Sequence, residues 1–524
     1  MELNALDCGV FVLYCIAVLT VGFWVARREK TAQDYFLASR RLPWYAIGFS
    51  LIATSISSEQ FIAEVGFAYR HGMAVANWEW GVFPAMTVMI LFFVPFYVRR
   101  QISTMPEWLE HRFGPSSRFT FALIMVLSYV FINLAGVLYT GGLALHVIFN
   151  MDKSYAILIL AVVTAVYTVA GGLPAVVWND VIQAILLLGA GLLVFFLGLD
   201  KVGGWEALRG TGERAHLILP ASDPDLPWTA ILVGMVSTNL WYYATNQYIN
   251  QRVLGAKNEW HARAGIIFAG FLGVFLALAV CFPGLIAYQL FPNLEKQDEA
   301  YPQVVSLLVG PLGYGLRGLV FAGLMAAIMS TLDALMNSCS AILTIDFYQR
   351  LWRPSATDRQ MIRVGRITTL AVLIAGVLWT PVVGQWEALF KYFQDCWFFM
   401  AVPIVVVFVS ALLWPRSNNL AATATLLLCI PMILLPALLQ ALHWQGNSFN
   451  LAGILLAPVI AFHVLVTYLR PAPPAEVADK WIWRPHMVFL RKEEKIGGYP
   501  WYRNLVLWWA VVAGIYIVLY AIFW

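Results

Sequence analysis

The first residues that could do chemistry are the polar side chains of the stretch 53-ATSISSEQFIAEVG-66, which interrupts an apolar run. The run extends from about residue 42 to residue 69 and could cross a bilayer, whose core is spanned by about 20 apolar residues. Because hydroxyl side chains compete for backbone hydrogen bonds, a helix break after Ala53 would free carbonyl groups near Ala53 and Ile56. A kinked helix whose hydroxyls bond to their own turn is the alternative. The acids and the glutamine of the stretch favour a break that faces a pathway.

A second polar interruption follows five apolar runs later, at 237-STNLWYYATNQYINQR-252. Asn239, Tyr242, Tyr243 and Asn246 are spaced by three, one and three residues, which places them on one helical face. An aromatic stripe alone is more often core packing. Paired interruptions in two corresponding halves, however, are the best sequence sign of a transporter's binding site. Because five is odd, the two halves would insert with opposite topology.

A third stretch, 326-AAIMSTLDALMNSCS-340, places Ser330, Asp333 and Asn337 along one helical face, with Thr331 beside them. Hydroxyls at this depth could simply hold helices together. A carboxylate at mid-helix, however, costs about 3 kcal/mol unless a partner offsets it, and Asp180 is a second deep acid. Free carbonyls, hydroxyls and carboxylates without sulfur or imidazole are the ligands of a hard cation. Sodium fits this set.

The elements that must position these residues are membrane-spanning helices. Of the 524 residues, 61% are hydrophobic and only 12% are charged, and the mean hydropathy is +0.73, so we expect an all-α polytopic membrane protein. About fourteen apolar runs are long enough to span: 6–26, 43–66, 76–98, 118–149, 154–172, 175–199, 227–249, 262–291, 315–345, 363–384, 387–413, 419–443, 449–469 and 502–523.

Basic residues predict the orientation and the organisation of the chain. Most of the 33 Lys and Arg residues fall in alternate loops, which the positive-inside rule assigns to the cytoplasm, so both termini would be extracytoplasmic. We expect an N-terminal extra helix with its loop in 1–42, a transport core in 43–413 and C-terminal spans in 414–524 with a cytoplasmic linker at 470–501. No enzyme signature is present: the chain has no nucleotide-binding loop, metal cluster or nucleophile-base arrangement.

Several ordered stretches resemble the sodium/solute symporter family, within its sodium/glucose cotransporter branch. They are 55-SISSEQF-61, 79-EW-80, 105-MPEWLEHRFG-114, 171-GGLPAVVWNDVIQ-183, 239-NLWYYATNQYINQRVLGAKN-258, 326-AAIMSTLDALMNS-338 and 389-LFKYFQDC-396. The resemblance implies a LeuT-like inverted repeat of five plus five helices, here spans 2–6 and 7–11, that works by alternating access in the cell membrane. It implies a small solute, sodium ions and the lipid bilayer as partners, and no nucleic acid.

The resemblance also implies roles for individual residues. The sodium ligands of the family fall on the carbonyls of Ala53, Ile56 and Ala327 and the hydroxyls of Ser330 and Thr331. Its sugar contacts fall on Gln60, Glu79, Asn239 and Gln394. Tyr242 takes the inner-gate position, Trp78 and Phe390 take outer-gate positions, and Asp180 matches an acid beside the sodium path.

Three departures from the branch concern the solute. Ser55 stands where sugar carriers have an Asn, Gly273 where they have a Lys, and Glu64 at an apolar outer-gate position. The predicted function is sodium-coupled symport of a neutral sugar or polyol. A cationic amine or amino sugar is the alternative solute, and a channel or sensor on the same fold is the alternative class. Glu64 could instead form a salt bridge with Arg70.

The role of the two deep acids also has alternatives. Asp180 and Asp333 could face each other between spans 6 and 9 and hold a second cation. Alternatively, Asp180 caps the start of span 6 near the cytoplasm, and Asp333 bonds to Asn337 or Ser330.

Overall fold

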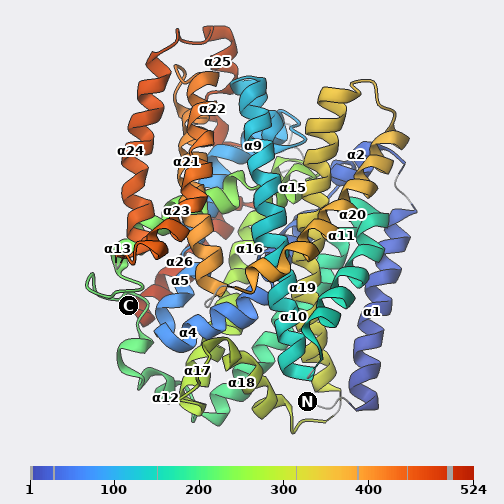
Figure 1. The fold of residues 1–524 in the computed structure, drawn as a ribbon, viewed down its shortest axis with the longest axis vertical. Coiled ribbons are helices and arrows are strands. Elements are labelled where there is room, and N and C mark those ends of the chain that lie inside the picture. The colour runs from blue at the N-terminus through green and yellow to red at the C-terminus, as the bar shows by residue number, and fades with distance from the viewer. Residues whose placement is uncertain are drawn as a thin grey trace.

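The computed structural model describes residues 4–27, 30–149, 151–313, 315–385, 389–444, 446–491 and 500–524, without the side chains of residues 147–149, 170, 389–392 and 477. Within these ranges the fold is helical and contains no strand beyond two isolated bridges. Most of the long helices run roughly along the longest axis of the molecule (Figure 1). The predicted all-α membrane fold is confirmed.

Eleven helices in the described part of the chain are long and apolar enough to cross a membrane. They are Ala5–Ala26, Glu59–Arg99, Pro115–His146, Gly171–Lys201, Glu259–Leu290, Leu316–Trp352, Asp358–Val383, Phe393–Leu413, Asn419–Ala441, Ser448–Tyr468 and Leu505–Phe523. Other expected spans fall on shorter or segmented helices, such as the apolar helix Lys153–Val169. The number of fourteen therefore stays a prediction.

The first predicted break lies where the hydroxyl residues are. Helix α3 (Trp44–Ser55) ends at Ser55, whose Oγ donates back to the carbonyl of Leu51 at 2.6 Å. Ile56 is extended, with φ −111° and ψ 124°. The chain then resumes as the π-helical segment η2 (Glu59–Glu64) and helix α4 (Val65–His71). The span is thus a broken helix and not a continuous kinked one.

The second break is equally distinct. It follows α13 (Trp228–Ala230), the π-helical segments η7 (Ile231–Met235) and η8 (Trp241–Thr245) and the intervening α14 (Val236–Leu240), and precedes α15 (Gln247–Leu254). Asn246 lies between η8 and α15 with φ −76° and ψ 126°, outside helical geometry. Both halves of the chain therefore contain one interrupted helix, as an inverted repeat with a central site requires.

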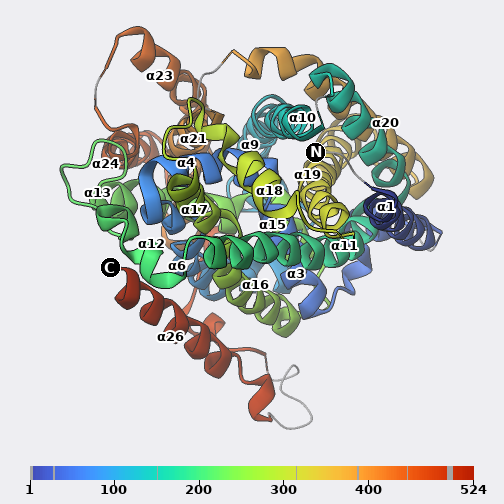
Figure 2. The ribbon, with the colours of Figure 1, turned by 90° about the horizontal axis from the view of Figure 1, so that it is seen from below.

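The centre of the bundle is formed by α11 (Lys153–Lys201) and α19 (Leu316–Ala341), which lie side by side in both views (Figures 1 and 2). A backbone kink at Gly172 divides α11 into the two helices expected from the sequence, and its φ of 50° suits a residue without a side chain. Helix α19 also packs against α3 and α1 (Ala5–Ala26). From residue 322 onward, every residue of α19 is buried.

Peripheral helices surround this centre. Helices α1 and α26 (Leu505–Phe523) lie on the rim (Figure 2), and only 22% and 11% of their most apolar stretches are buried. The other helices of eight or more residues are α8 (Met105–Arg112), α9 (Pro115–Ser128), α10 (Ala135–Phe149), α16 (Glu259–Val280), α17 (Phe282–Leu290), α18 (Ala300–Val309), η10 (Ile342–Trp352), α20 (Asp358–Val383), α21 (Leu389–Leu413), α22 (Asn419–Leu427), α23 (Cys429–Ala441) and α24 (Ser448–Tyr468).

Candidate functional site

Two hydroxyls of α19 meet the carbonyl groups that the first break exposes. Ser330 Oγ donates to the Ala53 carbonyl at 2.5 Å, and Thr331 Oγ1 donates to the Ile56 carbonyl at 3.0 Å. Both hydroxyls also lie near the Ala327 carbonyl, at 3.4 and 3.3 Å respectively. All five residues are buried. The structure thus brings together the whole predicted set of neutral oxygens, a set suited to a hard cation.

The break itself explains why these carbonyls are available. In a continuous helix the Ser57 amide would donate to the Ala53 carbonyl, four residues earlier. Here the Ser57 amide donates to Gln60 Oε1 at 2.7 Å, and the Ser57 hydroxyl donates to the same atom at 3.0 Å. Gln60 therefore caps the restarted helix, and the Ala53 carbonyl, which loses the Ser57 amide, accepts from Ser330 Oγ and from the Ile56 amide at 3.4 Å.

A small central pocket lies next to this oxygen set. It has a volume of about 50 Å³ and is lined by Ser55, Gln60, Glu64, Trp78, Glu79, Val82, Thr238, Asn239, Tyr242, Tyr243, Gln394 and Trp397. The four predicted solute contacts and three of the four predicted gate residues are therefore neighbours. The fourth, Phe390, is outside the described side chains. This volume is well below the roughly 300 to 1,000 Å³ of ligand pockets in general.

Trp397, which the sequence did not single out, also lines this pocket. Trp397 lies three residues after Gln394 on α21, and a helical spacing of three could have indicated it. Its ring centroid lies 6.0 Å from that of Tyr242, and Tyr248 contacts Tyr242 from another side at 5.7 Å. An aromatic wall of this kind suits the apolar face of a ring-shaped solute.

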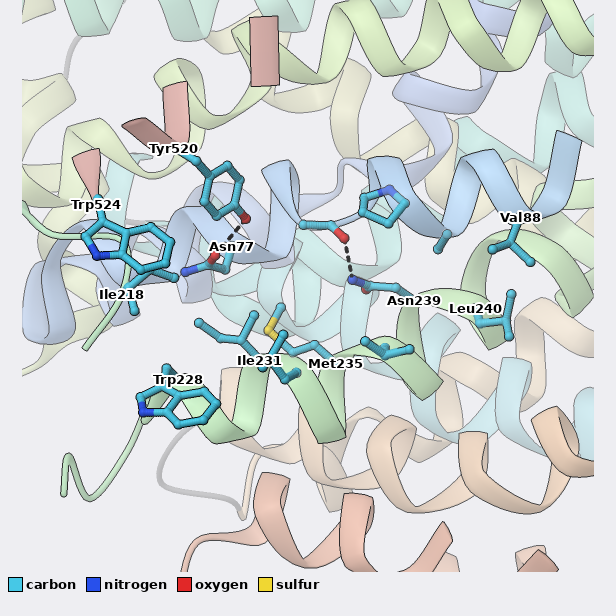
Figure 3. A pocket seen from close by; sticks show the side chains of 15 residues that line it. Asn77, Val88, Ile218, Trp228, Ile231, Met235, Asn239, Leu240, Tyr520 and Trp524 are labelled. Atoms are coloured by element: carbon cyan, nitrogen blue, oxygen red, sulfur yellow. Dashed lines mark hydrogen bonds between the residues drawn. The ribbon is translucent and has the colours of Figure 1, made fainter. Parts of the chain in front are cut away.

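Unpartnered polar atoms indicate what the pocket can bind. Gln394 Oε1 is buried and has no hydrogen-bond partner among the described residues, and a buried polar atom of this kind costs about 1 to 3 kcal/mol. Asn239 Nδ2 donates to the Gly81 carbonyl at 3.2 Å (Figure 3). A solute with hydroxyl groups would satisfy Gln394 and offer Asn239 and Gln60 new partners.

Asn239 also lines a larger cavity (Figure 3). Its volume is about 610 Å³, and its lining is mainly apolar, largely from η7, α14 and the end of the chain. Tyr520 donates to Asn77 Oδ1 at 2.8 Å. Among the described residues, this cavity has no buried polar side-chain atom without a partner, whereas the central pocket has Gln394 Oε1.

Glu64 does not lie at an exposed mouth. It is buried at 1% exposure and lines the central pocket, whereas Arg70 is exposed. No ion pair between the two is formed in the described ranges. Instead Glu64 accepts a hydrogen bond from Cys281 Sγ at 3.2 Å and faces the carboxyl of Glu79.

Asp180 lies within α11, beyond the Gly172 kink, and does not cap a helix start. It forms an ion pair with Arg252 at 3.4 Å, with both side chains fully buried. Ser50 also donates to it. The sequence interpretation missed Arg252, although a buried carboxylate requires a cation or several donors, and Arg252 closes the second polar stretch.

Asp333 accepts a hydrogen bond from Tyr167 at 2.8 Å, and neither Asn337 nor Ser330 donates to it. It lies close enough to Asp180 and Arg252 to interact with both electrostatically. One oxygen of each acid, Oδ1, is buried without a described partner. A cation between the two acids therefore stays a prediction.

Residues 35–428 match the sodium:solute symporter family. The chain is 36% identical over 511 residues to a sodium/glucose cotransporter of Vibrio parahaemolyticus, covering 91% of this chain and 93% of that protein. It is 32% identical over 544 residues to sodium/myo-inositol cotransporter 2 of Sus scrofa, covering 92% and 79% respectively.

The structure is also similar to that of a Na⁺-coupled sialic acid symporter in its substrate-bound outward-open state. The TM-score is 0.78 at 23% sequence identity, over 90% of this chain and 100% of the other. This likeness shows a shared fold, the LeuT-like inverted repeat. The match over most of the sequence shows, moreover, that the chain belongs to the sodium:solute symporter family.

Proposed function

We propose that the protein is a symporter in which sodium, entering down its gradient, drives uptake of a small neutral polyhydroxy solute by alternating access. One observation carries the proposal: the helix break that supplies the Ala53 and Ile56 carbonyls also positions Gln60 in the central pocket through its bonds to Ser57. A sodium ion that orders this break would also order a solute contact. Such a shared element is what coupling between two sites requires.

The side chains of the pocket favour a sugar or polyol. Gln60, Asn239 and Gln394 each carry an amide that can donate to one hydroxyl and accept from another, and Glu79 adds acceptors. Tyr242 supplies a flat ring. The glucose and myo-inositol carried by the named relatives belong to the same chemical class. We assign Tyr242 to the inner gate and Trp78 to the outer gate, where Trp78 contacts Phe449 with ring centroids 5.7 Å apart.

A cationic amine or amino sugar is the second candidate. The pocket has two acids, Glu64 and Glu79, and no Lys, Arg or His among its lining residues. A fixed positive charge on the solute would neutralise one of them. Replacing Glu64 by Gln distinguishes the two candidates, since a cationic solute would lose most of its affinity.

We also propose that Asp180 and Asp333 hold a second sodium ion during transport, beside Arg252. One charge crossing 100 mV is worth about 2.3 kcal/mol, or roughly a 50-fold solute gradient per ion. Reversal potentials under varied solute gradients would give the ratio of sodium to solute. A ratio of two sodium ions per solute in the unaltered protein that falls to one in Asp333→Asn would support the second site. A ratio of one in the unaltered protein would refute it.

We also propose the bounds of the transport core and the side of the membrane on which the two termini lie. The transport core is residues 43–413, flanked by 1–42 and 414–524, and both termini face outward from the cell membrane. Contacts at the two ends support a common side. His216 bonds to the carbonyl of Trp524, and Asp7 accepts from the amide of Gly318, so both termini lie against loops that the basic-residue pattern places outside.

Uptake into sealed vesicles tests the proposal. Purified protein is reconstituted, and labelled sugars, polyols and amines are offered with and without an inward sodium gradient. We expect one sugar or polyol to accumulate above its outside concentration only with the gradient. Equal uptake without the gradient would mean a channel or uniporter, and selective uptake of amines would favour the second candidate.

A further inference from the structure

Two carboxyl groups face each other in the central pocket. Glu64, from η2, and Glu79, from α5 (Asn77–Trp80), lie within hydrogen-bonding reach of each other and both line the pocket. They are 1% and 7% exposed. Two carboxylates cannot hydrogen-bond to each other, because each offers only acceptors, so a contact of this kind requires a proton between them.

Among the side chains that the structure describes, no Lys, Arg or His lines the central pocket, so none of them removes this requirement. The ionisable groups that face it from the packed elements are Glu59 on η2, Cys281 at the end of α16, Tyr242 and Tyr243 on η8, and Tyr516 on α26, with Asp298 on η9 and Tyr301 on α18 behind η2. Arg252, which acts electrostatically on Tyr242, is ion-paired with Asp180.

The site also lacks room for a cationic side chain from α16. Gly273 has no side chain, and a Cβ placed on it would lie 2.9 Å from the hydroxyl of Tyr516 and 4.0 Å from the Glu79 carbonyl. Tyr516 is held there because its hydroxyl donates to the Gly270 carbonyl at 2.8 Å. Helix α26 therefore fills the space beside Glu79 with a neutral phenol.

We propose that Glu64 and Glu79 share one proton and act together as the donor and acceptor for a hydroxyl group of the solute. The inference rests on the proposed function and specifies how its pocket recognises the solute. Glu64 Oε1 already accepts a hydrogen bond from Cys281 Sγ. The other carboxyl oxygen of Glu64, Oε2, is therefore the one that carries the proton toward Glu79. When the solute enters, Glu64 donates to a solute oxygen, and the hydroxyl on that oxygen donates to the Glu79 carboxylate.

This arrangement makes solute affinity depend on pH. The protonated pair binds, whereas the doubly ionised pair has no donor and repels itself. Affinity should therefore fall as pH rises, by about tenfold per pH unit once the shared proton is lost, as linkage to a single proton requires. Sodium binding without solute at the site formed by Ala53, Ile56, Ala327, Ser330 and Thr331 should not follow this profile, since its ligands are neutral oxygens.

The test combines two measurements on the full-length protein. Apparent solute affinity is measured at saturating sodium across the neutral and alkaline range, about pH 6 to pH 9, in the unaltered protein, in Glu64→Gln and in Glu213→Gln. Glu213 is an exposed acid outside the pocket and serves as the matched control. We expect the alkaline fall in the unaltered protein and the control, and a flat profile in Glu64→Gln, whose amide keeps a donor but cannot ionise.

Infrared spectroscopy of the same proteins detects the proton without transport. The C=O stretching band of a protonated carboxyl should be present at neutral pH, weaken in Glu64→Gln and Glu79→Gln, and shift in Cys281→Ser. If this band does not change in any of the variants, the proposal is overturned whatever the solute is. If the band behaves as expected but no solute accumulates with sodium, the proposed function fails while the shared proton stands.

Discussion

Replacing Thr331 by Ala should weaken sodium coupling strongly and leave membrane insertion intact. Thr331 Oγ1 is one of five oxygens in the proposed sodium site, at 3.0 Å from the Ile56 carbonyl and 3.3 Å from that of Ala327. A hydrogen bond or contact to a charged group contributes about 1.5 to 3 kcal/mol. Because each 1.4 kcal/mol is a factor of ten, the sodium concentration for half-maximal uptake should rise roughly 10- to 150-fold.

Two control variants separate ligation from packing. Thr331→Ser keeps the hydroxyl and should keep sodium affinity within a few-fold of the unaltered protein. Thr168→Ala removes another buried hydroxyl, which donates only to the Thr164 carbonyl of its own helix at 2.8 Å, and should not change the sodium dependence. If Thr331 only holds helices together, its removal should cost about 0.6 kcal/mol of stability and little else.

The assay is initial solute uptake into proteoliposomes as a function of outside sodium concentration, together with sodium-dependent thermal stability in detergent without solute. Both readouts should shift together in Thr331→Ala. An unchanged sodium dependence in this variant would refute the site. An equal loss of sodium affinity in Thr331→Ala and Thr331→Ser would show that the shape of the side chain matters, and not its oxygen.

Two further predictions concern the pocket and the cytoplasmic side. Gln60→Ala and Gln394→Ala should each lower solute affinity about tenfold, the value of one hydrogen bond; unchanged affinity in both variants would place the solute elsewhere. Sodium-dependent thermal stability without solute should be retained in Gln394→Ala but weakened in Gln60→Ala, which also removes the cap of the restarted helix. On α8, burial alone would raise the pKa of Glu110, but hydrogen bonds from Arg350 and Arg118 hold that pKa below its usual range. These ion pairs should therefore stabilise the protein above about pH 4, and this stabilisation should be lost as pH falls further. In Glu110→Gln, the unfolding temperature should lack this decrease at acid pH.

Much of the site could be predicted because its residue types conflict with their surroundings. Polar side chains inside apolar runs indicated both helix breaks, and the structure has them next to Ser55 and at Asn246. The same logic indicated a hard-cation site, since a broken helix frees carbonyls and Ser330 and Thr331 supply hydroxyls at the same depth. The individual sodium ligands, Ala327 included, were implied by the family resemblance and stay a prediction.

The rest depends on contacts between distant segments, which local patterns do not encode. The pairing of Asp180 with Arg252 joins residues that are 72 positions apart, and composition alone did not indicate which cation would meet the acid. The contact of Glu64 with Glu79 depends on how η2 rotates after the break. Each further residue along a helix turns the side-chain direction by about 100°. The sequence alone therefore could not decide whether Glu64 points to an outer mouth or into the pocket.

Sodium and solute should move together, because their two sites share the broken helix at Ala53–Gln60. Fluxes of radiolabelled sodium and of labelled solute, measured in the same reconstituted vesicles, test this claim most directly. We expect each to accelerate the entry of the other at a fixed ratio, and we expect both accelerations to be lost together in Thr331→Ala. Sodium entry that is independent of solute, with solute entry independent of sodium, would contradict coupled transport.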